Sequence, residues 1–582
     1  MITLSRHPPT VVADTSPRRR LRGMWLGAGI PTLLIWLHAQ AYGRWVVDDA
    51  GLTFAYARSL ATGAGAVLQP GATPVEGYSS PAWLAILVLG RWLGLFDHGV
   101  LFGQSDLVMF PKLLALACCF AMFAAMFAVA AAVARHPVVV TVMAGSATAA
   151  VPSFAIWTTS GLENALLACA VVGVAAVLAT TTVDDRLLET STAIKLGLLS
   201  ALAALTRPEG TIYLLAYPIA VALIAPRSRR AVAAVGISSL TFAVPVVAYL
   251  VWRIVTFSDY LPNTARAKEQ SWPALTDLGR PAELITYAGW ITAVVSISVV
   301  TVALTRRGDN QRALIAVLVP LGLAVVAFAF LESDWMAQYR FATPVWPLTA
   351  LSVAVAVVGN DGVMRTAAPL RKGVLFAAAG LAAVHSLNQF AYYTEQFRTD
   401  PTVGVCNIAL NTGYQINGYA DILGVGANGS LAAADGGGTS LTSRLRFVDL
   451  AGLAEPQVAR FWQDDDMAGL RDYLLDDVRP TFVKLFTGWD HRTRVALTDD
   501  PRFVRDYIPL MALGPGGGDW VRRDAVPDAV ALQRARTWGA DALATINALY
   551  DGVVPVRWNC GATLRPTPTG VGDPAPSPLA GG

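Results

Sequence analysis

The feature that most constrains the fold of this chain is a series of long apolar runs. A helix needs about 20 apolar residues to cross a bilayer, and eleven runs approach that length: 25–43, 107–134, 137–157, 163–181, 193–206, 209–225, 231–256, 284–305, 312–331, 341–358 and 373–390. Of the 582 residues, 54% are hydrophobic and only 15% are charged, which excludes an ordinary water-soluble protein. We therefore predict a polytopic α-helical membrane protein of the plasma membrane with about eleven transmembrane helices.

The placement of basic residues orients these segments. Arg18, Arg19, Arg20 and Arg22 precede the first run, and cytoplasmic flanks are enriched in Arg and Lys. Residues 1–24 are then a cytoplasmic tail without the cleavage site of a signal peptide. Every second connection is also basic, through Arg135, Arg186 with Lys195, Arg227 to Arg230, Arg306 to Arg312, and Arg365 to Lys372. The apolar stretch 81–96, which contains Arg91, must then be an in-plane helix on the outer face, since an extra span would invert this order.

The chain changes character after residue 390. Spanning-length runs stop and Asp, Arg, Gly and Pro become frequent. We expect transmembrane helices within 25–390, a first outer loop at 44–106, an extracytoplasmic soluble α/β-type domain at 391–565 and a disordered tail at 566–582. The patterns around 447–450 and 481–486 predict strands, and 456–475 predicts a helix. Cys406 and Cys560 are the two cysteines of the exported part, which favours a disulfide in an oxidising compartment.

The chemistry of the chain is expected in its outer connections, because they combine acids, amides and aromatics. Asp48 and Asp49 follow the first span, and Glu76 lies further along the same loop. Later outer connections carry Glu163, the pair Arg207 and Glu209, the segment with Tyr260, Asn263, Arg266 and Lys268, and Arg340. Acids in such positions serve proton transfer, and Arg or Lys bind anions.

Each of these features also has a structural interpretation. The two aspartates fit a solvated loop start, and Glu163 fits the N-terminus of a helix, where its charge is favourable. Arg207 with Glu209 fits a charge pair at a helical hairpin, and Arg266 with Lys268 fits contacts to lipid headgroups. All of these structural interpretations would have to be correct at the same time, on one face of the membrane. We consider a reaction site on that face the better interpretation.

Several of these motifs, taken in order, resemble a known family. They are Asp48-Asp49-Ala50-Gly51-Leu52, Thr159-Ser160-Gly161-Leu162-Glu163-Asn164, Arg207-Pro208-Glu209 and Leu261-Pro262-Asn263-Thr264 followed by Ala267-Lys268. Over residues 40 to 345 the chain resembles the GT-C superfamily of membrane glycosyltransferases. Within it, the chain looks most like the actinobacterial enzymes that add terminal β-1,2-arabinofuranose to cell-wall arabinan.

This resemblance implies transfer of a sugar, expected to be arabinofuranose, from a polyprenyl-phosphate donor such as decaprenylphosphoryl-arabinose. The acceptor would be arabinan or another glycan outside the membrane. It implies Asp48 as general base, with Asp49 orienting the acceptor or replacing Asp48, and Glu163 as a second acidic contact. The resemblance makes Arg207, Arg266, Lys268 and Arg340 the phosphate-binding candidates; Tyr260, Asn263, Glu76 and Glu209 complete the substrate-binding set. Some members place a divalent cation between loop acids, and Asp48 with Glu163 would be its ligands here; the metal is left open.

Three other functions remain as alternatives. A mannosyltransferase that uses polyprenyl-phosphate mannose would need the same site groups. A lipid or glycan transporter belongs to a different class, but the chain has no Walker A motif for ATP and no evident inverted repeat. A scaffold for cell-wall assembly is a third class. Membrane lipids are expected partners in every case, and the net charge of +3 does not suggest nucleic acid.

Overall fold

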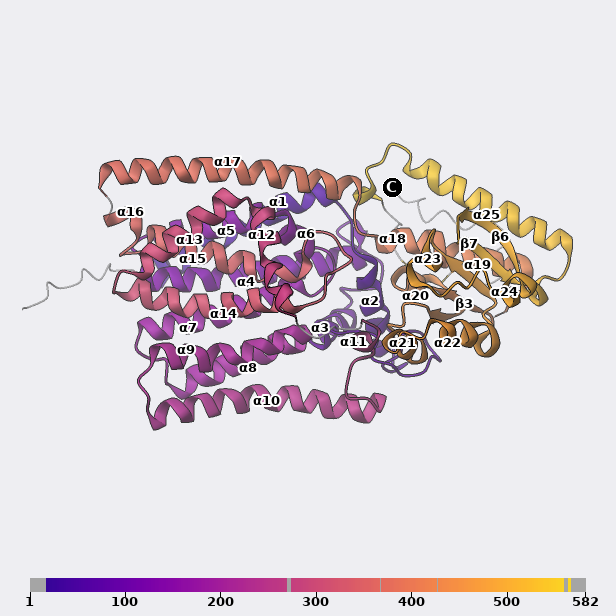
Figure 1. Cartoon of the computed structure of the whole chain (residues 1–582), viewed down its shortest axis with the longest axis horizontal. Helices are drawn as coiled ribbons and strands as arrows, with labels where there is room; N and C mark the ends of the chain where they lie inside the picture. The colour runs from indigo at the N-terminus through magenta and orange to yellow at the C-terminus, as the bar shows by residue number, and fades with distance from the viewer. Residues whose placement is uncertain (1–16, 269–273, 367, 427, 559–563, 567–582) are drawn as a thin grey trace, which may run out of the picture.

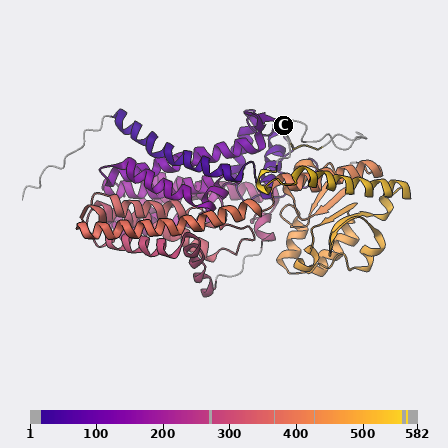
Figure 2. The same cartoon turned by 90° about the horizontal axis from the view of Figure 1, so that it is seen from above.

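The molecule has two parts that lie end to end along its long axis (Figure 1). The computed structural model describes residues 17–268, 274–366, 368–426, 428–558 and 564–566. A bundle of long helices reaches to residue 399, and a smaller part built around a β-sheet follows it. Figure 2 shows the same division from above, with the sheet part at one end of the bundle.

The bundle contains a helix at each of the eleven predicted runs. These helices are α1 (Pro17–Ala39), α4 (Asp106–Val133), α5 (Pro137–Ala150), α7 (Asn164–Val183), α8 (Thr190–Thr206), α9 (Ala216–Ile224), α10 (Arg229–Phe257), α13 (Trp290–Leu304), α14 (Asp309–Phe330), α15 (Val345–Val358) and α17 (Pro369–Thr399). Helix α7 packs against α4, α8 and α14 and is largely buried. Helices α10 and α17 lie at opposite edges of the bundle in Figure 1 and bury few side chains, as expected of lipid-facing helices.

Among the described residues, six helices are long and apolar enough to cross a membrane, and eight if each of two bent pairs forms one span. The multi-span helical architecture is therefore confirmed, while eleven spans stay a prediction. Two runs are not straight. Helix α5 turns by 82° into α6 (Pro152–Thr158), and α12 (Pro281–Ala288) turns by 108° into α13. Pro152 lacks the amide that would continue α5, and Gly289 adopts a positive φ of 94°, which glycine allows.

Two helices cross predicted domain boundaries. Helix α1 begins at Pro17, so Arg18 to Arg22, which belong to the predicted cytoplasmic tail, lie in its first turns. Helix α17 continues to Thr399, past the predicted domain start at 391.

The apolar stretch at 81–96 forms the 12-residue helix α3 (Pro81–Trp92), which is too short to cross about 30 Å of hydrocarbon. Residues 1–16 and 567–582, which hold most of the two predicted tails, lie outside the described residues.

The connections predicted to be cytoplasmic meet at the end of the bundle away from the sheet. Arg312 forms an ion pair of 2.5 Å with Asp185, which joins the start of α14 to the end of α7. Arg306 donates hydrogen bonds to the carbonyls of Asp361 and Gly362. The basic connections thus share one end, and the acidic and aromatic motifs share the other.

The sheet has five strands: β3 (Ser430–Ala433), β4 (Arg446–Asp449), β5 (Phe482–Leu485), β6 (Tyr507–Gly514) and β7 (Gly517–Arg522). Their order is β4-β3-β5-β7-β6, with β3 parallel to β4 and β5, and β7 antiparallel to both of its neighbours. The two predicted strands are β4 and β5. The predicted helix at 456–475 is instead interrupted between α21 (Pro456–Gln463) and α22 (Met467–Asp472), because Asp466 accepts a hydrogen bond from the amide of Gly469 and caps α22.

One face of the sheet shares its hydrophobic core with the first loop of the bundle. Side chains alternate between the faces of a strand. Leu431, Ala433 and Phe447 pack into the core that contains Val46 and Leu52. The intervening side chains form a separate core under α21 and α22, of which Ala432, Val448 and Val483 are members. The sheet part is therefore anchored on the bundle through buried apolar surface.

Helix α2 (Asp48–Ala61) binds both ends of the short helix α20 (Gly437–Thr442). The Asp48 carboxylate accepts hydrogen bonds from the amides of Gly437 at 3.0 Å and Gly438 at 2.7 Å. At the other end, Arg58 donates to the carbonyl of Leu441 at 3.0 Å. A Cβ atom on Gly437 would lie 1.8 Å from the Asp48 carbonyl oxygen, so this approach requires glycine.

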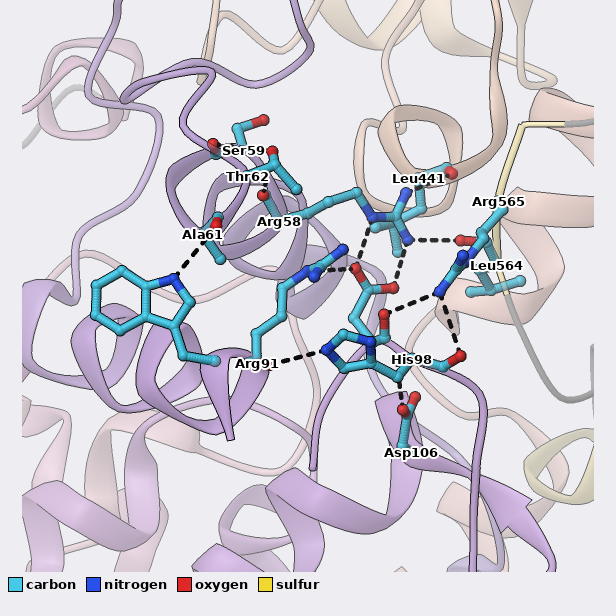
Figure 3. A network of polar contacts seen from close by, with 12 residues as sticks. Arg58, Ser59, Ala61, Thr62, Arg91, His98, Asp106, Leu441, Leu564 and Arg565 are labelled. Atoms are coloured by element: carbon cyan, nitrogen blue, oxygen red, sulfur yellow. Dashed lines mark hydrogen bonds and ion pairs between the residues drawn. The ribbon is translucent and has the colours of Figure 1, made fainter. Parts of the chain in front are cut away.

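A polar network extends the same contact to the C-terminal segment (Figure 3). Arg58 also donates to both carboxylate oxygens of Asp97, at 2.7 and 2.8 Å, and to the carbonyl of Leu564 at 2.6 Å. Arg565 donates in turn to the carbonyls of Asp97 and His98. One arginine thus ties α2, α20 and the last described residues together.

We predict that the contact between α2 and α20 stabilises the folded protein. Asp48→Ala leaves two buried amides without an acceptor, at a cost of about 1–3 kcal/mol each. We expect a lower melting temperature of the purified protein, measured by intrinsic fluorescence, and faster proteolysis between the two parts. Asp499→Asn is the control, since Asp499 is exposed. Unchanged melting and proteolysis in Asp48→Ala would contradict the role given to this contact.

Candidate active site

A cavity of about 350 Å³ opens where the bundle meets the sheet part. Its wall is built from several segments far apart in the sequence, and six predicted residues line it: Asp49, Glu163, Arg207, Glu209, Lys268 and Arg340. Tyr78, Phe341 and Leu453 add apolar and aromatic surface. Leu453 belongs to the sheet part, so both parts contribute to the wall.

Asp49 is the aspartate that faces this cavity. Neighbouring residues of a helix point about 100° apart, so Asp48 and Asp49 cannot share one direction. Asp48 is 3% exposed and points to α20, whereas the side chain of Asp49 is 23% exposed and lines the cavity. Asp48 therefore anchors α2 on α20, and Asp49 is the member of the pair that lines the cavity.

The backbone beside the aspartates is held on two sides. The amide of Val47 donates to the carbonyl of Ser160 at 3.0 Å, and the amide of Asp48 donates to Val403 at 3.0 Å. Gly161, in the same turn as Ser160, has a φ of 91°, and a Cβ atom there would lie 2.7 Å from a methyl group of Val46. This glycine turn lets the segment before Glu163 lie close to the start of α2.

Arg207 is held in place by two glutamates. It forms an ion pair of 2.6 Å with Glu163 and a second one with Glu209, and its guanidinium lies 4.9 Å from the centre of the Phe341 ring. Glu163 is 3% exposed and Arg207 is 7% exposed. A buried arginine of this kind keeps its charge and its direction. The predicted pairing of Arg207 with Glu209 is therefore present, but within the cavity wall.

Arg340 is positioned by residues that were not among the predicted site residues. Its guanidinium forms an ion pair of 2.7 Å with Asp334. Its carbonyl accepts a hydrogen bond of 3.1 Å from Asn164, and Phe341 lies beside it at 5.0 Å. Asp334 and Asn164 stand within sequence motifs rich in polar residues, but only the fold shows that both act on Arg340.

Lys268 is the cation of the cavity with the weakest internal partner. Its ammonium lies 3.8 Å from the Asp49 carboxylate, and its side chain is 47% exposed. An exposed pair at this distance contributes little stability. Lys268 can therefore exchange its partner for a ligand at low cost.

Four predicted substrate-binding residues lie outside this cavity. Glu76 is buried against Arg253 and Tyr249, the latter at 2.6 Å. Asn263 donates to the carbonyls of Gly452 and Leu453 and so attaches its loop to the sheet part. The other two are Arg266, which pairs with Asp259 at 2.6 Å, and Tyr260, whose side chain is exposed.

Two further features considered in the sequence are a metal site and a disulfide. The metal, which the sequence left open, stays open: Asp48 is bound to backbone amides, and among the described residues no group of three or more His, Cys, Asp or Glu is placed to hold a metal ion. Cys406 forms a disulfide. Cys560, its expected partner, lies outside the described residues.

Comparisons with known proteins place the fold. No family model matches the chain, and no curated protein matches it in sequence. The crystal structure of ArnT from Cupriavidus metallidurans bound to undecaprenyl phosphate is similar with a TM-score of 0.53 and 12% identity, over 86% of this chain and 98% of that one. The archaeal oligosaccharyltransferase AglB from Archaeoglobus fulgidus, in complex with an inhibitory peptide and a dolichol-phosphate, is similar with a TM-score of 0.50 and 10% identity, over 88% and 75%. The chain therefore shares the overall fold of these two solved structures.

Proposed function

We propose that this protein is a membrane glycosyltransferase that moves a sugar from a polyprenyl-phosphate donor to a glycan acceptor on the outer face of the membrane. The observation that carries the proposal is the cavity itself, where Asp49 faces Arg207, Arg340 and Lys268 at the end of a spanning bundle. The structural neighbours support it, since the two described above were solved with undecaprenyl phosphate and dolichol-phosphate.

The chemistry follows from these groups. Asp49 accepts the proton of an acceptor hydroxyl, and the hydroxyl oxygen forms a bond to the anomeric carbon of the donor sugar. The bond between that carbon and the phosphate oxygen breaks, and the electron pair leaves with the polyprenyl phosphate. Arg207, Arg340 and Lys268 stabilise the charge that develops on the phosphate.

The three cations have different tasks in this mechanism. Arg207 and Arg340 are already paired with carboxylates. Their guanidinium groups are therefore held in place and need not move during the reaction. Lys268 has only its distant contact with Asp49. When the donor phosphate takes up Lys268, Asp49 loses this contact and is free to accept a hydrogen bond from the acceptor hydroxyl.

The sugar and the acceptor are the finer part of the proposal. The motifs shared with terminal arabinofuranosyltransferases favour arabinofuranose, with decaprenylphosphoryl-arabinose as donor and arabinan as acceptor. Incubating the purified protein with radiolabelled polyprenyl-phosphate arabinose and polyprenyl-phosphate mannose, in separate reactions, tests this. Consumption of the mannose donor alone would replace the arabinose assignment and keep the reaction class.

We predict that Asp49→Asn lowers turnover on the order of a hundredfold or more, because it removes the base. Donor binding should change little, since the amide keeps the size of the side chain. The measurement is transfer of radiolabelled sugar by purified protein, with Asp499→Asn as the control. Full turnover in Asp49→Asn would move the base to another residue.

Lys268 and Arg266 lie near each other in sequence, so substitutions at the two positions serve as test and control. Lys268 lines the cavity, while Arg266 points to Asp259 outside it. Lys268→Ala should raise the apparent KM for the donor on the order of tenfold or more, from the loss of about 1.5–3 kcal/mol of charge-assisted hydrogen bonding. Arg266→Ala should leave the donor KM close to wild type. Equal effects of the two substitutions would contradict the assignment of Lys268 to the phosphate.

The orientation can be tested by labelling cysteines in intact cells. Asp499 is exposed on the sheet part, and Arg227 is exposed at the opposite end of the bundle. A membrane-impermeant maleimide should label Asp499→Cys and leave Arg227→Cys unlabelled until the cells are lysed. The reverse pattern would place the cavity on the cytoplasmic face.

A further inference from the structure

A second and larger cavity, of about 700 Å³, lies on the sheet side of the same junction. Its volume falls within the range of about 300–1,000 Å³ that small-molecule sites occupy. Trp335 from the bundle contributes to its wall, together with Asn407, Asn411 and Asp435 and residues near the end of α25 (Ala529–Tyr550). The residues assigned to the donor do not line it.

The polar groups of this junction cavity suit uncharged hydroxyl groups. Asn407, Asn411 and Asn547 line it, and their side chains make no hydrogen bond to the rest of the described chain. An amide both donates and accepts hydrogen bonds, as a sugar hydroxyl does. Asn411 lies in a π-helical turn (Ala409–Tyr414), a local distortion that is frequent at functional sites.

The aromatic residues point to the same kind of ligand. Trp335 is 64% exposed although it borders a cavity, which leaves the face of its indole ring free to stack on an apolar sugar face. Trp558 and Phe486 are further aromatic members of the wall. Amides combined with flat aromatic surfaces are typical of carbohydrate sites, because a sugar ring has hydroxyl edges and apolar faces.

The charge of the junction cavity disfavours the donor phosphate. Lys484 is its one lining cation among the described residues, and it is already paired at 2.7 Å with the fully buried Asp519. Asp435 and Asp551 add negative charge. The smaller cavity differs in its charge, because three cations line it.

Two observations connect the junction cavity with Asp49. Asp334 and Trp335 are adjacent in sequence, and Asp334 holds Arg340 of the first cavity while Trp335 borders the second. Asp435 comes two residues before Gly437, whose amide donates to Asp48, so it stands beside the start of α2. Burial, with a smaller contribution from the charge of Asp49, raises the pKa of Asp435 to about 6.

The junction cavity also continues along the surface. A third cavity of about 280 Å³, bordered by Arg44 and Trp45, shares Val403, Asn407 and Trp558 with it. The two cavities therefore adjoin along a common wall. Two adjoining cavities offer room for a chain of sugar units as well as for a single sugar.

We propose that the junction cavity binds the acceptor as an oligosaccharide of several units, with Trp335 stacking on one sugar ring and Asn411 bonding its hydroxyls. Asp435 accepts a hydrogen bond from the terminal unit and directs its reactive hydroxyl to Asp49. This inference rests on the proposed glycosyl transfer and adds where the acceptor lies and which residues select its length.

The test uses the full-length protein in nanodiscs and linear arabino-oligosaccharides, from disaccharide to hexasaccharide, with manno-oligosaccharides in parallel. Trp335→Ala and Asn411→Ala should each raise the acceptor KM of the hexasaccharide on the order of tenfold, as expected for a lost contact of about 1.4 kcal/mol. The donor KM and the KM of the disaccharide should change much less. Phe102→Ala, at an exposed aromatic of another loop, is the control.

The length dependence separates a binding role from a folding defect, because a misfolded variant would lose activity with every acceptor. An unchanged hexasaccharide KM in both variants, in an active enzyme, would overturn the inference and leave the proposed function intact. If the wild type transfers no sugar, the inference is tested by binding of the same oligosaccharides. Quenching of tryptophan fluorescence measures that binding and does not depend on the proposed function. Binding that Trp335→Ala abolishes would support it, and absence of binding would reject it.

Discussion

The structure depends on one contact between a carboxylate and two backbone amides. Asp48, at the start of α2, accepts from Gly437 and Gly438 at the start of α20. Burial and the nearby Asp435 raise the pKa of Asp48, while the two amides oppose that rise. A charge or a hydroxyl in so dry a place is costly unless it is hydrogen-bonded. Because Asp49 is the next residue, this contact also sets the direction of the proposed base.

The positive charges of the 350 Å³ cavity, for which we propose the donor phosphate as ligand, are balanced within the protein itself. Glu163 and Glu209 hold Arg207, and Asp334 holds Arg340. Each buried pair avoids the large cost of an isolated charge. Fixed pairs provide a preorganised electrostatic environment, whereas the loosely paired Lys268 provides the adjustable contact. An anionic lipid can enter such a site without leaving an uncompensated buried charge behind.

The two cavities of the molecule differ in charge and in surroundings. The cavity proposed for the donor lies where the bundle meets the sheet part, and three cations line it. The junction cavity lies toward the sheet and carries amides and aromatic rings. Asp49 and Asp435 mark the border between the two. The sheet part packs on the first loop through the shared core of Leu431 and Val46, and this packing fixes the position of one cavity relative to the other.

The sequence by itself determined the bundle, because apolar runs of spanning length have few other ways to satisfy their backbone groups. It also identified Arg207, Glu163, Lys268 and Arg340, since charges beside spans are costly and need a reason to persist. The tertiary structure alone decided which of Asp48 and Asp49 lines the cavity, and it placed Arg266 and Asn263 outside that cavity. The direction of Asp48 and of Asn263 is set by contacts with the sheet part, 389 and 189 residues later in the chain. Local sequence carries no information about such distant partners.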